Sequence, residues 1–445
     1  MKERRGLLAV RTVVVLALVL GGAHFWRAGH EGVGLACGLL GGLACTSRAW
    51  VRLVLLGVLP VLAACWVFSA GQFVQLRMFM GLPWGRLLGI LGGVAVLTCT
   101  AALLLHTERA RQGFSRSAAQ AGPQAVVFLT VCAVLGGLGY WMPDMLLIQR
   151  FFPGWGGLQV VLLALWGVWL CGRLLERKTA IAARLRAYRL FSAVFFLQLA
   201  LGLFVSGSFL LTGSVHLPVP GVIIASPFYR DTSLFMPVLF VVSVCLMGAA
   251  WCSHLCYFGP LDTLFATRKK GRKPLPPALA ATLRRSRLVF LGLAIAVPLI
   301  LRATGASGAV ALGAGLALAA LLLPLGWHVG RKYGVAAYCL GICPLGLLAL
   351  WIGKLAPWRV RRTESCTECL ACTRVCQYAA LTPESLRAGH ALGACTLCRD
   401  CMNACPHGGL TLGCWNTRWR GQWVERAFVV LAVIMHCLFL GVARV

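Results

Sequence analysis

Acidic residues are scarce in this sequence of 445 residues, with 12 Asp and Glu against 42 Lys and Arg. Charged residues make up 12% of the chain, about half the share in an ordinary soluble protein, and hydrophobic residues make up 59%. This composition excludes an ordinary cytosolic enzyme, a secreted disulfide scaffold and a disordered tail. In so apolar a chain, a net charge of +30 indicates basic loops beside membrane lipid. Nucleic acid is not an expected partner.

Several catalytic signatures are also missing. No carboxylate lies at the centre of a long apolar run, which counts against a classical ion-coupled transporter. The sequence has no G-x-G-x-x-G after a strand, no P-loop and no Ser-His-Asp arrangement that would indicate nucleotide use or hydrolysis. The nine His are not paired at matched depth in facing runs, so haem is not expected. We therefore predict no catalytic residues of a separate substrate site.

Long apolar runs dominate what is present. A membrane helix needs about 20 mostly apolar residues. Ten runs have roughly that length, and a shorter Gly-rich run at 32–46 brings the predicted spans to eleven. The ten longer runs lie at 7–26, 53–72, 87–106, 124–142, 155–172, 190–211, 233–251, 288–303, 307–327 and 427–443. The chain is thus predicted to be an all-α polytopic membrane protein.

The distribution of basic residues predicts the orientation. If the N-terminus is cytoplasmic, the inward loops hold 24 Lys and Arg and the outward loops hold six. The run at 32–46 matters here, because omitting it would invert every later loop. No small-residue cleavage site follows the first apolar run, so an uncleaved anchor is expected. We predict a multi-pass protein of the bacterial inner membrane, with the polar segment near 354–420 in the cytoplasm.

That polar segment contains eight of the 21 cysteines in two regular runs. The runs CTECLACTRVC and CTLCRDCMNACP both have the spacing C-x2-C-x2-C-x3-C of bacterial two-cluster ferredoxins, in which the fourth Cys ligates the other cluster. Zinc ribbons lack this spacing, and disulfides are disfavoured in the cytoplasm. The prediction is a small α+β ferredoxin-like domain with two [4Fe–4S] clusters. The first would be held by Cys366, Cys369, Cys372 and Cys405, and the second by Cys395, Cys398, Cys401 and Cys376.

Two further cysteine pairs end apolar runs. WCSHLCYFGPLD contains Cys252 and Cys256, and YCLGICPLGLL contains Cys339 and Cys343, 87 residues later at both positions. Each pair follows two predicted spans, which indicates a tandem repeat. Residues four apart share one helix face, so the four thiols could converge. They would then hold a further cluster or metal or form a redox disulfide, unless they are small packing residues.

Residues 190–415 resemble the NapH/NosR type of polytopic membrane ferredoxin, a group that also includes copper-oxidase assembly ferredoxins. The resemblance rests on the order of two helices, a C-x3-C motif, two helices, a second C-x3-C motif and a two-cluster ferredoxin. It implies cytoplasmic clusters that pass electrons from quinol or a cytoplasmic donor to a periplasmic or membrane redox partner. The sequence departs from the pattern in having Tyr257 and Gln377 where Pro is usual. It also lacks the N-terminal flavin-binding domain of the NosR kind.

The predicted organisation has four parts. Residues 1–189 form a helical membrane region of unassigned role, 190–353 the tandem repeats, 354–420 the ferredoxin domain and 421–445 a final membrane helix. The leading hypothesis is an electron-transfer protein, which could act as a component of a quinol dehydrogenase. A copper reductase that assembles an oxidase and a redox-sensing scaffold or transporter are the alternatives.

Overall fold

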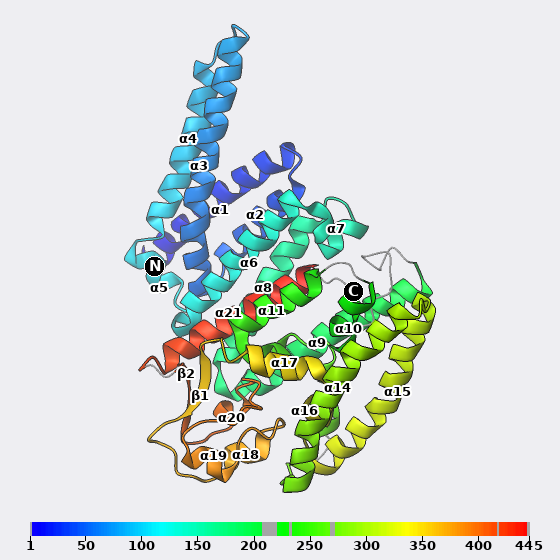
Figure 1. Ribbon diagram of the computed structural model, residues 1–445. Coiled ribbons are helices and arrows are strands. Elements are labelled where there is room, and N and C mark those ends of the chain that lie inside the picture. The colour runs from blue at the N-terminus through cyan, green and yellow to red at the C-terminus, as the bar shows by residue number, and fades with distance from the viewer. Residues whose placement is uncertain (1, 207–219, 231–233, 268–271, 416–417, 443–445) are drawn as a thin grey trace. The chain divides into compact units, whose positions relative to one another are not determined.

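The computed structural model describes residues 2–206, 220–230, 234–267, 272–415 and 418–442. These residues are mainly helical, and the chain divides into two compact units, Met1–Gly172 and Arg173–Val445 (Figure 1). The predicted spans at 190–211, 233–251 and 427–443 each run at one end into residues outside the described ranges. We describe the two units separately.

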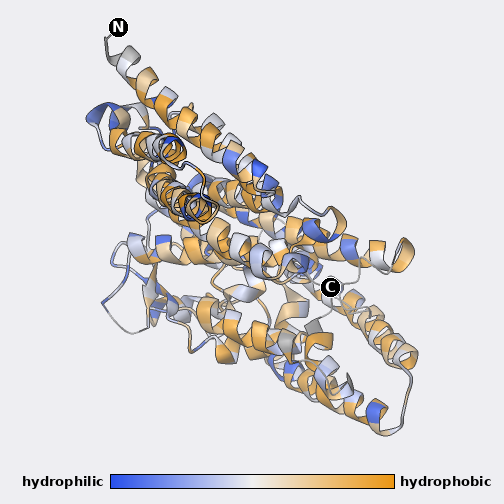
Figure 2. Cartoon of the chain, turned by 90° about the horizontal axis from the view of Figure 1, so that it is seen from above, coloured by the Kyte–Doolittle hydropathy of each residue, from blue (hydrophilic) through white to orange (hydrophobic). Residues whose placement is uncertain are grey.

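Ten helical segments in the described ranges are long and apolar enough to cross a membrane, and they coincide with ten of the eleven predicted runs. Hydrophobic residues cover these helices along most of their length (Figure 2). The prediction of a multi-pass membrane protein is therefore supported by helix length as well as by composition. The segments are Gly6–Arg27, Ala49–Phe79, Gly85–Leu104, Ala118–Trp141, Gly156–Leu175, Arg177–Phe204, Met236–His254, Pro277–Ala303, Gly308–Tyr333 and Gln422–Val442.

The eleventh predicted span is wrong as a full crossing. Helix α2 (Glu31–Ala44) has 14 residues, which at about 1.5 Å per residue falls well short of a hydrocarbon core of about 30 Å. Its glycines serve close packing against α1 (Lys2–Arg27). A Cβ on Gly34 would lie 3.0 Å from the carbonyl oxygen of Gly22. The composition of 32–46 thus reflects a tightly packed helix pair.

The N-terminal unit consists of α1, α2, α3 (Ala49–Phe79), α4 (Gly85–Leu104), α5 (Glu108–Gly113), α6 (Ala121–Trp141), α7 (Leu147–Phe151) and most of α8 (Gly156–Leu175). Glycines again allow two helices of this unit to approach closely. A Cβ on Gly32 would lie 2.6 Å from the Cα of Gly157, so α2 and α8 touch backbone to backbone.

The long helices of the C-terminal unit are α9 (Arg177–Phe204), α14 (Pro277–Ala303), α15 (Gly308–Tyr333) and α21 (Gln422–Val442), with the shorter α10 (Pro220–Arg230) and α11 (Phe235–Met247). A turn at Gly305, which has a φ of +66°, joins α14 to α15. The most apolar windows of α14 and α15 are only 11% and 0% buried. This hairpin therefore presents its side chains to lipid.

The cysteine-rich segment folds as a small α+β element at one end of these helices (Figure 1). Strands β1 (Trp358–Arg362) and β2 (Leu410–Cys414) pair antiparallel, with Trp358 opposite Cys414. Three short helices lie between them: α18 (Ala371–Val375), α19 (Pro383–Arg387) and α20 (Asp400–Asn403). Strand β2 leads into α21 and packs against it.

Candidate functional site

Twelve cysteines line three separate cavities in the C-terminal unit. Eight of these cysteines belong to the two runs and line two of the cavities, with Cys376 and Cys405 each placed beside the cysteines of the other run. The first cavity is lined by Cys366, Cys369, Cys372 and Cys405. The second is lined by Cys376, Cys395, Cys398 and Cys401. The third is lined by Cys252, Cys256, Cys339 and Cys343.

The two loops that line the first and second cavities have left-handed backbone conformations at matching positions. In each run, the third and fifth residues have a left-handed backbone without being glycine: Glu368 and Leu370 in one run, Leu397 and Arg399 in the other. Such a conformation costs about 1 kcal/mol or more at a non-glycine residue. Its recurrence at the same two positions shows that the two loops share the same local backbone conformation.

The fourth cysteine of each run also has a matching environment. The backbone N–H of Ala380 donates to the Sγ of Cys376 at 3.3 Å, and that of Gly409 donates to the Sγ of Cys405 at 3.2 Å. Hydrogen bonds of this kind stabilise negative charge on sulfur and tune the potentials of iron–sulfur sites. The two halves therefore offer equivalent sulfur environments.

Burial affects the thiols of these cavities strongly. It raises the pKa of Cys395 to about 12 and that of Cys372 to about 11. Cys369 is the exception, because it is exposed and the N–H of Ala371 lowers its pKa. Buried thiols of this kind stay neutral near pH 7 unless a positive charge lies beside them. Bound iron would supply that charge and keep the sulfurs as thiolates.

The donor set suits a group of several atoms. Among the described residues, no three His, Cys, Asp or Glu side chains are gathered closely enough to hold a single metal ion. Four cysteines nevertheless line each cavity. Four cysteine ligands are the donor set that a [4Fe–4S] cluster takes. That these cysteines bind clusters remains a prediction.

The two C-x3-C motifs form similar turns around the third cavity. The N–H of Cys256 donates to the carbonyl of Trp251 at 3.0 Å, and that of Cys343 donates to the carbonyl of Tyr338 at 2.9 Å. The carbonyl of the first cysteine in each motif accepts a hydrogen bond from a preceding helix, from Tyr188 on α9 for Cys252 and from Arg287 on α14 for Cys339. The two motifs therefore share their local hydrogen bonds.

The motifs differ after their second cysteine. Cys343 directly precedes α17 (Pro344–Ile352), and its Sγ accepts the N–H of Gly346 at 3.2 Å. After Cys256, by contrast, two residues intervene before α13 (Gly259–Thr267) begins. The first of these is Tyr257, which stacks on Phe195. The longer bend after the first motif leaves Cys256 in the cavity wall.

Asp262 on α13 connects the first motif to the second. Its carboxylate accepts the N–H of Cys339 at 2.8 Å and that of Tyr338 at 3.2 Å. Burial raises the pKa of Asp262 to about 6, and the two N–H donors oppose that rise. Asp262 stands in the quoted motif WCSHLCYFGPLD, but nothing in the pattern shows that it binds backbone 76 residues away.

A buried polar network ties the second cavity to the helices. Arg184 on α9 (3% exposed) pairs with both carboxylate oxygens of Asp400, at 2.9 and 2.5 Å, and donates to the carbonyl of Ser253 at 3.1 Å. The hydroxyl of Ser253 in turn donates to the carbonyl of Thr396 at 2.7 Å. Sequence analysis missed this network, because Arg184 and Asp400 are 216 residues apart. His254, which lies inside the first motif, packs on Phe428 and is not part of the cavity wall.

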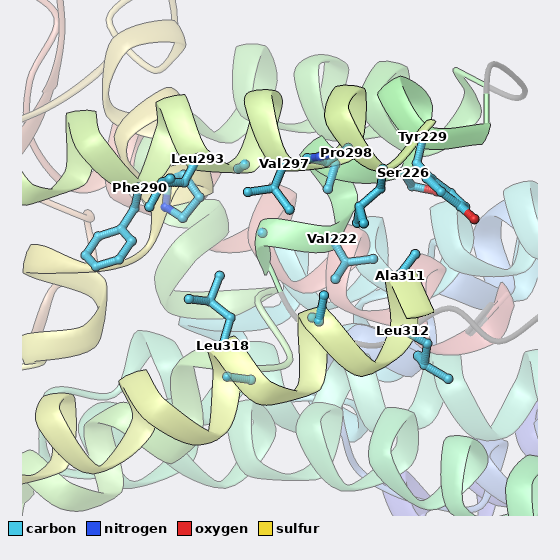
Figure 3. A pocket seen from close by; sticks show the side chains of 18 of the residues that line it. Val222, Ser226, Tyr229, Phe290, Leu293, Val297, Pro298, Ala311, Leu312 and Leu318 are labelled. Atoms are coloured by element: carbon cyan, nitrogen blue, oxygen red, sulfur yellow. The ribbon is translucent and has the colours of Figure 1, made fainter. Parts of the chain in front are cut away.

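A larger apolar pocket lies among α10, α14 and α15 (Figure 3). Aliphatic side chains and Phe290 line it, with Ser226 and Tyr229 among the few polar groups. The lining also includes Tyr338, Ile342 and Pro344 of the second motif. This pocket therefore reaches the backbone that carries Cys339 and Cys343.

Comparison with known proteins gives a sequence similarity that bears on function. The chain is 25% identical over 198 residues to a protein of Escherichia coli (strain K12) named "Putative electron transport protein YccM". The matched region covers 40% of this chain and 55% of the relative, so the chain spans about half the length of that curated protein. No protein-family profile matches the chain. No solved structure matches it.

Proposed function

We propose that this chain is a membrane-bound electron-transfer protein that carries two [4Fe–4S] clusters in its cysteine-rich segment. The observation that carries the proposal is the exchange of Cys376 and Cys405 between two four-cysteine cavities with matching backbone. The similarity to an electron transport protein supports the general role. When bound, such clusters take up and release single electrons.

The two cavities differ in their surroundings, and the difference indicates which kind of partner each cluster would contact. Cys369 in the first cavity is exposed, so a soluble partner can approach there. The second cavity lies against the membrane helices through the Arg184–Asp400 pair and the bond from Ser253 to Thr396. We infer that the first cluster exchanges electrons with a soluble protein and the second with the membrane.

The apolar pocket favours quinol as the partner on the membrane side. Its aliphatic lining suits an isoprenoid chain, and it extends to Tyr338 and Pro344 beside the third cavity. Quinol is also compatible with a cytoplasmic position for the clusters. A copper reductase would need a copper-binding site, and the pocket lining offers no thiol, imidazole or carboxylate for one.

The test uses the full chain purified without oxygen and placed in liposomes with a quinol analogue. Visible absorbance of the clusters would fall on reduction by quinol and recover on addition of an oxidant. If quinol leaves the absorbance unchanged while a copper(II) salt rapidly oxidises the chemically reduced clusters, the assembly role is favoured instead. Finding zinc in place of iron in the purified protein would overturn the proposal of electron transfer.

A further inference from the structure

The third cavity resembles the first and second cavities in its lining. It is lined by four cysteines, two from each C-x3-C motif. Cys252, Cys256 and Cys343 are each no more than 7% exposed. The N–H···Sγ contact at Cys343 matches those at Cys376 and Cys405 in length, at 3.2 Å against 3.3 and 3.2 Å.

The polar groups around this cavity point to a ligand that accepts hydrogen bonds. Four buried donor groups in its wall have no hydrogen-bond partner among the described residues. Each of the four side chains is at least nine-tenths buried. Leaving such a group without a partner costs about 1–3 kcal/mol. The atoms are Trp251 Nε1, Arg287 Nε, Tyr378 OH and Thr396 Oγ1.

The chemistry of these donors separates the candidate occupants. Trp Nε1 and Arg Nε can only donate, so an occupant that satisfies them must present hydrogen-bond acceptors. A disulfide removes the thiolates and leaves only weakly accepting sulfur. A cluster with four thiolates and four sulfides carries a net negative charge and presents many acceptor sulfurs. The guanidinium of Arg287 would compensate part of that charge.

The location of the cavity suits a relay. Tyr378 and Thr396 line both the third cavity and the second cavity, so the two spaces are neighbours. On another side, Tyr338 and Pro344, the neighbours of Cys339 and Cys343, line the apolar pocket. An occupant of the third cavity would therefore lie between the second cluster and the membrane pocket.

We propose that Cys252, Cys256, Cys339 and Cys343 bind a third [4Fe–4S] cluster, which relays electrons between the second ferredoxin cluster and a quinol in the apolar pocket. The inference rests on the proposed function and adds the site that connects it to the membrane. Each transfer between the clusters moves one electron and changes no bond. Oxidation of a quinol would supply two electrons in sequence and release two protons.

The experiment compares iron and acid-labile sulfide in full-length protein purified without oxygen. With four irons in each cluster, the unaltered chain should contain about twelve irons and the double variant Cys252→Ser/Cys339→Ser about eight. Cys245→Ser is the matched control, because Cys245 lies in the same span outside the cavity wall, and it should retain about twelve. Eight irons in the unaltered chain, with the four cysteines as thiols or a disulfide, would overturn the proposal. A single zinc or copper ion at these cysteines would also overturn it.

Two further variants separate this inference from the proposed function and from misfolding. The variant Cys366→Ser/Cys395→Ser should lose the ferredoxin clusters and keep about four irons in the third cavity. Iron absent from the eight ferredoxin cysteines, but present in the third cavity, would reject the proposed function alone. Trp251→Phe should retain about twelve irons and lower the midpoint potential of one cluster, because it removes one donor to a cluster sulfur. Unchanged potentials would contradict a cluster beside Trp251.

Discussion

Gly409 lies where the first cavity leaves no room for a side chain. A Cβ at this position would be 2.8 Å from the Cα of Cys366, which is backbone and cannot rotate away. Ala380 occupies the equivalent position beside the second cavity, so the backbone conformation does not require glycine. Gly409 is required because the backbone of Cys366 approaches so closely. The sequence shows the cysteine ligands through their spacing, but this contact joins residues 43 apart and has no local signature.

The variant Gly409→Ala should lose most iron from the first cluster and keep the second. The added methyl group would push the loop of Cys366 away from Cys405 and spoil the four-cysteine arrangement. Iron analysis with electron paramagnetic resonance on the reduced protein would measure the loss. Gly393→Ala is the control, because a Cβ there meets nothing within 4 Å, and it should leave both clusters intact. Equal loss in both variants would contradict this account.

At the scale of elements, the sequence predicted ten spans and failed on the eleventh. Hydropathy measures only how apolar a run is. The residues of the Gly-rich run at 32–46 form α2, which packs closely against α1. The apolar content of a run alone does not separate a spanning helix from a short packed one.

The Arg184–Asp400 pair was also missed by sequence analysis. Its members belong to segments that look unrelated in sequence, a basic helix start and a cysteine motif.

Removing one member of that pair should destabilise the joint between α9 and α20. Arg184 and Asp400 are both almost fully buried, and breaking a buried pair leaves an uncompensated charge at a cost of about 3–5 kcal/mol. Thermal unfolding in detergent should show a large loss for Arg184→Met. The double variant Arg184→Met/Asp400→Asn should recover much of it, because no unpaired charge remains. A double variant as unstable as the single one would show that the pair itself does not hold the joint.

At the scale of the whole molecule, the distribution of basic residues in the C-terminal unit supports the predicted cytoplasmic position of the cysteine-rich segment. Basic residues occupy the end of its helices beside the cysteine-rich segment, and the α14–α15 turn near Gly305 marks the opposite end. This evidence comes from the C-terminal unit alone, so it stands although α2 is too short to cross. The residues at the cysteine-rich end are Arg173, Arg177, Lys178, Arg184, Arg186 and Arg189 of α8 and α9, Arg284, Arg285 and Arg287 of α14, and Arg331 and Lys332 of α15.

A protease site inserted at Gly393 should be cut only from the cytoplasmic side of sealed vesicles, and one inserted at Ala306 only from the opposite side. The positive-inside rule gives this expectation. Immunoblots of right-side-out and inverted vesicles would read the cleavage, with the uninserted chain as the control. Cleavage at Gly393 from the outer side would contradict the proposed orientation.

The most direct test of the central claim is which cysteines act on the same cluster. Single Cys→Ser variants at positions 366, 376, 395 and 405 would be purified without oxygen, reduced and compared by electron paramagnetic resonance. We predict that Cys376→Ser and Cys395→Ser alter one signal, and that Cys366→Ser and Cys405→Ser alter a different signal, as the two cavities group them. If each contiguous run of four cysteines instead behaves as one site, or if the protein contains zinc and no iron, the account is contradicted.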